Sequence, residues 1–158
     1  MEAARNSLEA GLGLATALCA TKEFISNENL LHYAEFVKLL GASFIWLIEP
    51  RAEGRYKGQD IALRKEHYAQ LDHFYLTLNS SREFRDYPRI LFPNYNHRRV
   101  GCAGAGTSNI LIDSDGYINP CPFCREQVVH SLDCNSEKSV KQMIEKGCFK
   151  FDQRQLQV

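Results

Sequence analysis

The sequence predicts an α/β fold for residues 1–93, followed by a small cysteine-rich module. In the first part, short apolar segments alternate with amphipathic helical patterns, as they do in parallel α/β folds. Beyond Arg99 the chain changes to hairpin and turn signals, and five of its six cysteines lie there. We therefore expect two domains, 1–93 and 100–151, with a linker at 94–99 and a tail at 152–158.

Three helix-to-strand steps make up the first part. A short helix at 2–8 precedes a buried apolar strand at 14–19. Ser26 or Asn27 can cap the next helix. Its apolar positions share one face, and they are Leu30, Ala34 and Val37. Gly41 then supplies the left-handed residue that ends this helix.

The next segment, Phe44–Ile48, is an uninterrupted apolar run. A strand that is apolar on both faces is typical of a parallel sheet covered by helices. A helical stripe follows, formed by Leu71, Phe74, Tyr75 and Leu78, and Arg89–Phe92 predicts a third strand. Three parallel strands leave two unpaired edges, so this part is expected to belong to a larger barrel or sheet.

The charge balance indicates which kinds of partner the protein can bind. Lys and Arg number 19, Asp and Glu also number 19, and the formal net charge is zero. This balance argues against a nucleic-acid partner. The sequence shows no signal-peptide pattern and no apolar run near the ~18 residues of a membrane span. We expect a cytoplasmic protein with no membrane partner. The basic triplet His97–Arg99 is expected to be a solvated linker; steadying an anionic metal centre or binding substrate is the alternative.

The second part centres on a predicted hairpin. Ile110–Ile112 and Tyr117–Ile118 flank a turn at Asp113–Gly116. The loop Asn119–Cys124 follows, and its prolines stiffen a C-x-x-C pair. Ser136 can cap a last helix with Val140, Met143 and Ile144 inward, which Gly147 ends just before Cys148.

The clustered cysteines predict a metal centre. An iron–sulfur cluster needs thiolates that converge from segments the fold holds together, such as the hairpin base, the C-x-x-C loop and the helix end. The expected ligands are Cys102, Cys121, Cys124 and Cys148, with Cys134 as the alternative to Cys148. Zinc is the alternative metal, although a Cys₄ zinc ribbon usually shows two C-x-x-C pairs. Cys19, inside an apolar strand, is expected to pack in the core.

Gly101-Cys102 is followed after thirteen residues by Gly116, and four further residues separate Gly116 from Cys121. With the Pro-Cys-Pro-Phe-Cys loop and a helix that ends in Gly-Cys, the stretch 100–149 resembles the SPASM/Twitch auxiliary-cluster domain of radical S-adenosylmethionine (SAM) enzymes. Gly41–Phe44 and Ile48–Arg55 are similar to the second half of the radical SAM partial barrel. The resemblance implies the C-terminal half of a partial (β/α) barrel, then a β-hairpin plus helix with one auxiliary [4Fe-4S] cluster.

The resemblance also implies a function, which is reductive cleavage of SAM and hydrogen abstraction from a substrate, often a peptide or protein. It places Glu49 and Arg51 in the SAM or substrate pocket. The sequence contains no C-x-x-x-C-x-x-C motif, so the chain is expected to be inactive alone. It would need a separate N-terminal barrel half or would self-associate. The alternatives are a non-enzymatic iron–sulfur module or gene remnant and, more weakly, a zinc-binding interaction domain.

Overall fold

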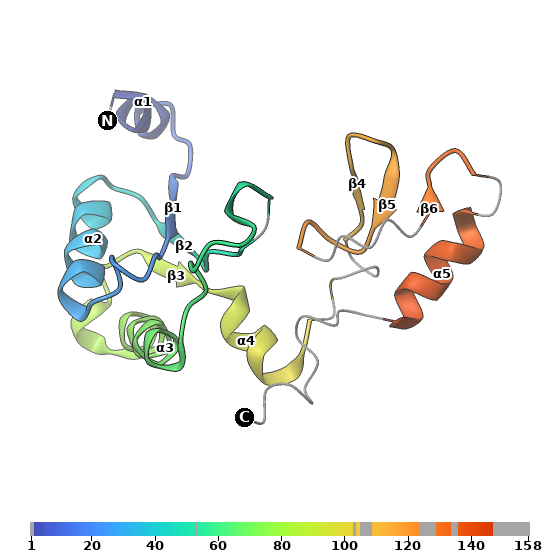
Figure 1. Ribbon diagram of the computed structural model, residues 1–158. Helices are drawn as coiled ribbons and strands as arrows, with labels where there is room; N and C mark the ends of the chain where they lie inside the picture. Colours follow the sequence, from blue (N-terminus) through green and yellow to red (C-terminus); the bar gives the residue numbers. More distant parts are fainter. Residues whose placement is uncertain are drawn as a thin grey trace. The chain divides into compact units, whose positions relative to one another are not determined.

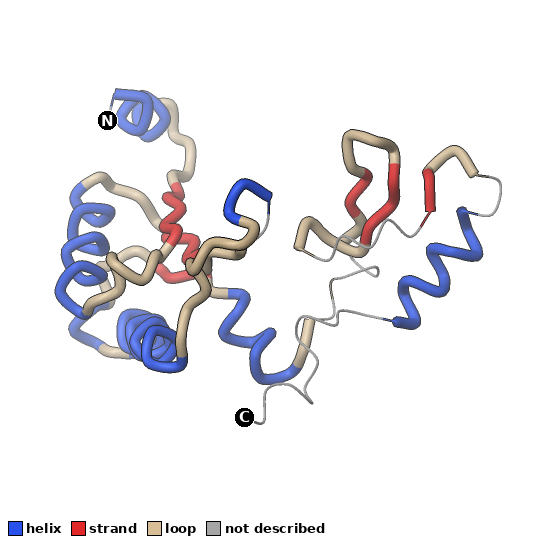
Figure 2. Tube along the Cα trace, in the orientation of Figure 1, coloured by secondary structure: helices blue, strands red, loops and turns tan. Residues whose placement is uncertain are grey.

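The computed structural model divides into two compact units, residues 1–94 and 95–158. The structure describes residues 2–52, 54–102, 104, 109–123, 129–133 and 136–146. These residues form five α-helices and two three-stranded sheets, one sheet in each unit (Figures 1 and 2). The described part of the chain is therefore mixed α/β. No helix in it is long and apolar enough to cross a lipid bilayer.

The first unit is built on a parallel sheet in the order β1 (Ala15–Cys19), β2 (Phe44–Ile48) and β3 (Arg89–Leu91). Its register sets Cys19 opposite Ile48 and Trp46 opposite Leu91. The remaining elements are α1 (Glu2–Glu9), α2 (Asn27–Leu39), the 3₁₀ turn η1 (Gly54–Tyr56), α3 (Lys65–Ser80) and the 3₁₀ turn η2 (Arg82–Phe84). This is the alternation of helix and strand that the sequence predicts.

Local chemistry explains where α2 begins and ends. The Ser26 hydroxyl accepts a hydrogen bond from the backbone N–H of Asn29 at 3.1 Å, so Ser26 is the N-cap. Gly41 adopts φ +79°, the left-handed conformation that follows a helix end. A methyl group there would also approach the Leu8 side chain to 3.0 Å. The sequence predicted both the Ser26 cap and the end of the helix at Gly41.

The core lies between the sheet and helices α2 and α3. The helices contribute the buried side chains Leu30, Ala34, Val37, Leu71, Phe74 and Leu78, and the strands contribute Leu18, Ile45, Leu47 and Ile90. In Figure 1 both helices lie on one side of the sheet. The two crossovers run in the same direction along the sheet, and parallel connections are almost always right-handed, so both helices pack on one face.

The expectation that Phe44–Ile48 is covered on both faces is wrong for the described residues. Along β2, Ile45 and Leu47 are buried, whereas Phe44, Trp46 and Ile48 are 42%, 52% and 38% exposed. The reason is the shared side of the crossovers, which leaves the opposite face without a helical layer. Cys19, expected in the core, is also exposed, because it alternates with buried Leu18 along β1.

The second unit contains a small antiparallel sheet. Its strands follow the order β4 (Leu111–Ile112), β5 (Tyr117–Asn119) and β6 (Val129–His130), and the last helix is α5 (Ser136–Lys146). The first two strands form the predicted hairpin, and the sequence patterns did not predict β6. Residues 94–99, expected to be a linker, belong to helix α4 (Pro93–Val100). Pro93 occupies the first helical position, where its missing N–H costs no helical hydrogen bond.

Candidate functional site

The first group of candidate residues lies at the carboxyl ends of the parallel strands. Glu49 directly follows β2 and is only 4% exposed. The Asn94 side-chain amide donates a hydrogen bond to Glu49 Oε2 at 2.8 Å, and Arg51 Nη2 lies 3.7 Å from the same oxygen. The structure thus brings together the two residues that the sequence predicts. In open parallel sheets this edge is where ligands bind.

Asn94 is a site residue that sequence reasoning missed. It follows β3 closely, as Glu49 follows β2, and the two strands are neighbours in the sheet. A signal was therefore present, namely a polar residue just beyond the carboxyl end of an adjacent strand. Because the amide holds Oε2, it fixes the orientation of a buried carboxylate that water would otherwise have to solvate.

Tyr68 of α3 extends this group. Burial raises the pKa of the Tyr68 hydroxyl, and the positive charge of Arg51 opposes the shift without cancelling it. The phenol therefore stays protonated across the physiological range and keeps its hydrogen-bond donor. Together with Glu49 and Arg51 it gives this edge an acceptor, a cation and a neutral donor, which is a set suited to holding a polar ligand.

A small cavity lies beyond the carboxyl ends of β1 and β2. Its volume is about 100 Å³, and it is lined by Cys19, Thr21, Lys22, Glu23, Pro50, Tyr56 and Ile61. Lys22 Nζ pairs with Asp60 Oδ1 at 2.7 Å and donates to the Asp60 carbonyl oxygen at 2.8 Å. The hydrogen bond and charge of Lys22 lower the pKa of Asp60. Lys22 and Asp60 were not predicted as site residues from the sequence.

The cysteine-bearing unit is organised by the turn of its hairpin. Asp113 Oδ1 accepts hydrogen bonds from the backbone N–H groups of Asp115 and Tyr117, at 3.1 and 2.9 Å. Its other oxygen, Oδ2, accepts from the Asn119 side chain at 3.2 Å, and Asn119 is fully buried. One carboxylate therefore ties the turn to the strand that leads into Cys121.

Gly116 and His130 join the hairpin to β6. Gly116 has φ +85°, and a methyl group on it would lie 2.5 Å from His130 Nε2. The His130 ring also packs edge-on against Tyr117, with centroids 5.4 Å apart. The Ser131 N–H donates to the Gly116 carbonyl at 2.8 Å. Glycine is required here both by its conformation and by the close approach of the imidazole.

Cys102 and Cys121 both lie next to Asn109, at the open end of the hairpin. A methyl group on Gly104 would lie 3.7 Å from Cys102 Sγ and 3.0 Å from Asn109 Nδ2, so these two side chains face the same point. The Asn109 N–H donates to the Gly104 carbonyl at 2.9 Å. Continuing the β4–β5 register by two residues sets Asn109 opposite Cys121, and each of these residues forms a single β-bridge.

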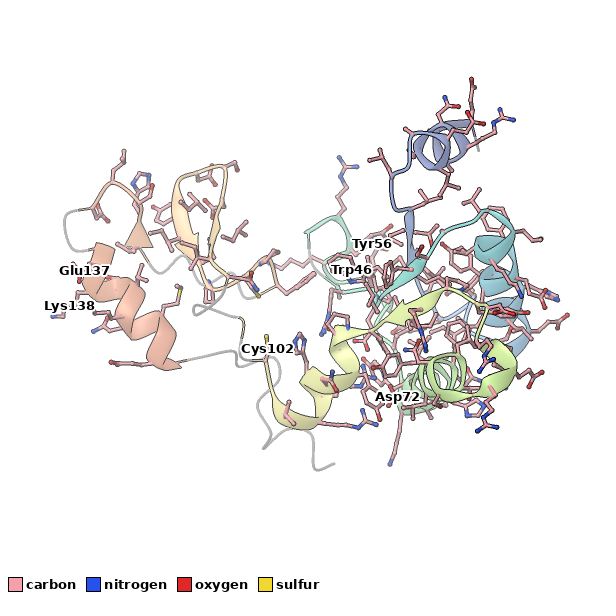
Figure 3. All side chains as sticks on the ribbon, turned by 180° about the vertical axis from the view of Figure 1, so that it is seen from behind. Trp46, Tyr56, Asp72, Cys102, Glu137 and Lys138 are labelled. Carbon is pink, nitrogen blue, oxygen red and sulfur yellow. The ribbon has the colours of Figure 1, made fainter. Side chains whose placement is uncertain are left out.

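Two of the predicted ligands, Cys102 and Cys121, are therefore described, and both are half-buried free cysteines (Cys102 is labelled in Figure 3). The other three predicted positions, Cys124, Cys134 and Cys148, lie outside the described residues. Within the described ranges no three His, Cys, Asp or Glu side chains converge as a metal site would require. The two described cysteines supply thiols, which is the donor chemistry that an iron–sulfur cluster requires.

The basic triplet lies on α4. The Arg99 guanidinium stacks over the Tyr95 ring, with 3.6 Å from Cζ to the centroid, and Arg99 Nη1 donates to the Tyr95 carbonyl at 2.8 Å. Burial lowers the pKa of Arg98 to about 10, and the charge of Arg99 adds to this shift. Arg98 is therefore still a cation at neutral pH. It lies on helix α4, whereas the sequence predicted a solvated linker at this position.

Comparison with known proteins adds no family assignment. No protein-family model matches the chain, and no significantly similar sequence is found among curated proteins. The interpretation of the site therefore depends on its residues and geometry.

Proposed function

We propose that this chain is the C-terminal portion of a radical SAM protein and that its second unit binds one auxiliary [4Fe-4S] cluster. The observation that carries the proposal is the position of Cys102 and Cys121, which are far apart in sequence and both lie beside Asn109. A cluster requires thiolates from separate segments, and Cys102 and Cys121 lie on two segments that both meet Asn109. The cysteine spacing and the motif order around Gly116 support the same assignment.

Cys102, Cys121 and Cys124 would hold the cluster, and Cys148 would complete the set, with Cys134 as the alternative to Cys148. When bound, such a cluster supplies one-electron redox chemistry or an anchoring point for substrate. The protein's own contribution is to fix the first two thiols. The Asp113 carboxylate orders the turn, and the Asn109 segment holds the open end of the hairpin.

The first unit supports the barrel part of the proposal. Its parallel strands carry helices on one face and apolar side chains on the other, as expected of strands from a partial barrel. Glu49 and Arg51 would line the pocket for SAM or a peptide or protein substrate. Asn94 would hold the Glu49 carboxylate, and Arg51 would bind a carboxylate of the ligand.

The printed sequence has no C-x-x-x-C-x-x-C motif, so under this proposal the cluster that cleaves SAM would be held by an N-terminal barrel half that the printed residues do not include. The printed residues alone would then not cleave SAM. An iron–sulfur cluster suits a reducing compartment, and we place the protein in the cytoplasm.

The ligand assignment is tested by serine substitution in the full chain, reconstituted with iron and sulfide without oxygen. Cys102→Ser and Cys121→Ser should each lose most of the bound iron, because each removes a thiolate that the hairpin base holds in place. Cys19→Ser is the matched control, since Cys19 lies in the other unit, and it should retain the iron. Equal iron loss in all three variants would contradict the assignment.

The same measurement decides the remaining ligand. Cys148→Ser should make the cluster oxygen-labile, because Gly147 is expected to end the last helix and turn Cys148 back toward the hairpin. Cys134→Ser should leave the cluster unchanged. The reverse result would assign the fourth position to Cys134, and no effect from either variant would indicate three protein ligands.

A further inference from the structure

A short loop closes one side of the cavity beyond the carboxyl ends of β1 and β2. The loop comprises residues 54–60, which we call the flap, and it begins with η1. Tyr56 of the flap, labelled in Figure 3, lines the cavity together with Ile61. The other lining residues are Pro50, Cys19, Thr21, Lys22 and Glu23. Segments that are far apart in the sequence therefore enclose the cavity.

The flap is held together by its own hydrogen bonds. The Lys57 N–H donates to the Gly54 carbonyl at 3.2 Å, and the Gln59 N–H donates to the Tyr56 carbonyl at 3.0 Å. The Gln59 side-chain amide also donates to the Arg55 carbonyl at 3.2 Å. All these contacts lie within the flap, so it can move as one piece without breaking them.

One side chain joins the flap to the rest of the unit. Lys22 Nζ lies 2.7 Å from Asp60 Oδ1 and donates to the Asp60 carbonyl oxygen at 2.8 Å. Among the described residues, no other hydrogen bond or ion pair links 54–60 to a distant part of the chain. The Lys22 side chain is 14% exposed and that of Asp60 is 81% exposed, so the ammonium group belongs to the body of the unit and the carboxylate is the mobile partner.

The backbone at the start of the flap leaves room for movement. Gly54 adopts φ +59°, and a methyl group there would meet nothing within 4 Å. Glycine populates both signs of φ at little cost, so this position can act as a hinge. Tyr56 is 56% exposed, so movement of the flap would give up little buried apolar contact.

We propose that the flap is a lid over this cavity and that the contact between Lys22 and Asp60 is its latch. The closed cavity has a volume of about 100 Å³, whereas pockets for small-molecule ligands span roughly 300–1,000 Å³. A ligand of that size therefore enters only when the flap opens. Glu49 and Arg51 follow β2 at the same edge of the sheet, so a role of the lid in binding SAM or substrate rests on the proposed function.

Trypsin can measure the opening of the flap, because Arg55 and Lys57 lie on it. A protease cuts a segment after it detaches from the body of the domain, so the rate of cleavage follows the open population. Lys22→Met and Asp60→Ala each remove the latch, and cleavage after Arg55 and Lys57 in the full chain should become at least about fivefold faster. Lys65→Met is the control, because Lys65 is an exposed lysine at the start of α3, and it should leave the rate unchanged.

Hydrogen exchange of Asp60→Ala tests whether the flap covers the cavity. Exchange should become faster in the flap and in residues 19–24, which face the cavity, and should stay unchanged in α3. Circular dichroism shows whether each latch variant is folded, and either folded variant suffices. Neither measurement includes SAM, and iron content is determined separately, so failure of the lid and failure of the proposed function are distinguishable. Unchanged cleavage in a folded latch variant, equal acceleration by Lys65→Met, or faster exchange confined to the flap would each overturn the proposal.

Discussion

The two units of the molecule are stabilised in different ways. The first unit places a continuous layer of aliphatic and aromatic side chains between its sheet and two helices, and Leu30, Ile45, Leu47 and Leu71 are buried to 2% exposure or less. Among the described residues of the second unit, the buried apolar side chains are Ile118, Pro120 and Met143, beside the polar Asn119. Its hairpin depends instead on the hydrogen bonds of Asp113.

This difference predicts how far the stability of each unit depends on a bound metal centre. A packed apolar core stabilises a fold without any ligand, whereas small domains with little core commonly require a metal or a disulfide. We therefore expect the first unit to fold with or without iron, and we expect the second unit to gain much of its stability from the proposed cluster.

Leu47→Ala should have the largest effect on the first unit. Leu47 is 2% exposed on the central strand, so truncation removes buried contacts and leaves a cavity. We expect a loss of about 3 kcal/mol in the free energy of unfolding, measured by urea denaturation with Trp46 fluorescence. Leu39→Ala, at an 88% exposed position, should change stability by less than about 0.5 kcal/mol. Comparable losses would show that the core lies elsewhere.

Gly116→Ala tests how the second unit is stabilised. Gly58 and Gly116 share nearly the same backbone conformation, with φ +82° and +85°, but a methyl group meets nothing within 4 Å at Gly58 and meets His130 at Gly116. Gly58→Ala should cost about 1 kcal/mol from conformation alone. Gly116→Ala should cost about 2–3 kcal/mol and should reduce hydrogen-exchange protection in Tyr117–Asn119. Equal costs would mean that His130 does not pack on the turn.

The smallest effect concerns the alkaline stability of the first unit. The pKa of Tyr68 is raised in the folded state, so the unfolded chain releases this proton at lower pH. The stabilisation is present below the unfolded pKa of about 10 and is lost as the pH rises through the folded value. In urea titrations between about pH 9 and 11, Tyr68→Phe should lessen the decline in stability. An unchanged decline would argue against burial of the phenol.

The elements of the first unit were readable from the sequence because local signals and packing agree there. Ser26, Gly41 and the α2 stripe of Leu30, Ala34 and Val37 each predict what the structure shows. The exposure of one face of the sheet could not be predicted, because an apolar run such as Phe44–Ile48 indicates suitability for burial and does not show which side is covered. Coverage depends on the direction of the crossovers, which is a property of the topology.

Part of the candidate site could be predicted from the sequence. Glu49 and Arg51 could be placed because they follow a strand directly, whereas Asn94 required knowledge that β2 and β3 are neighbours. In the second unit the hairpin was evident from Asp113–Gly116, but β6 is only two residues long and carries no periodic signal. Pro93 was interpreted as a boundary, and the structure uses it to begin α4.

The metal content of the full chain decides whether the second unit binds an iron–sulfur cluster. The chain is purified without oxygen, reconstituted with iron and sulfide in the presence of equimolar zinc, and then freed of unbound metal. The proposal predicts about four iron and four sulfide ions per chain, with a brown colour and broad visible absorption from sulfide-to-iron charge transfer. Stoichiometric zinc with no iron, or no retained metal at all, would contradict it.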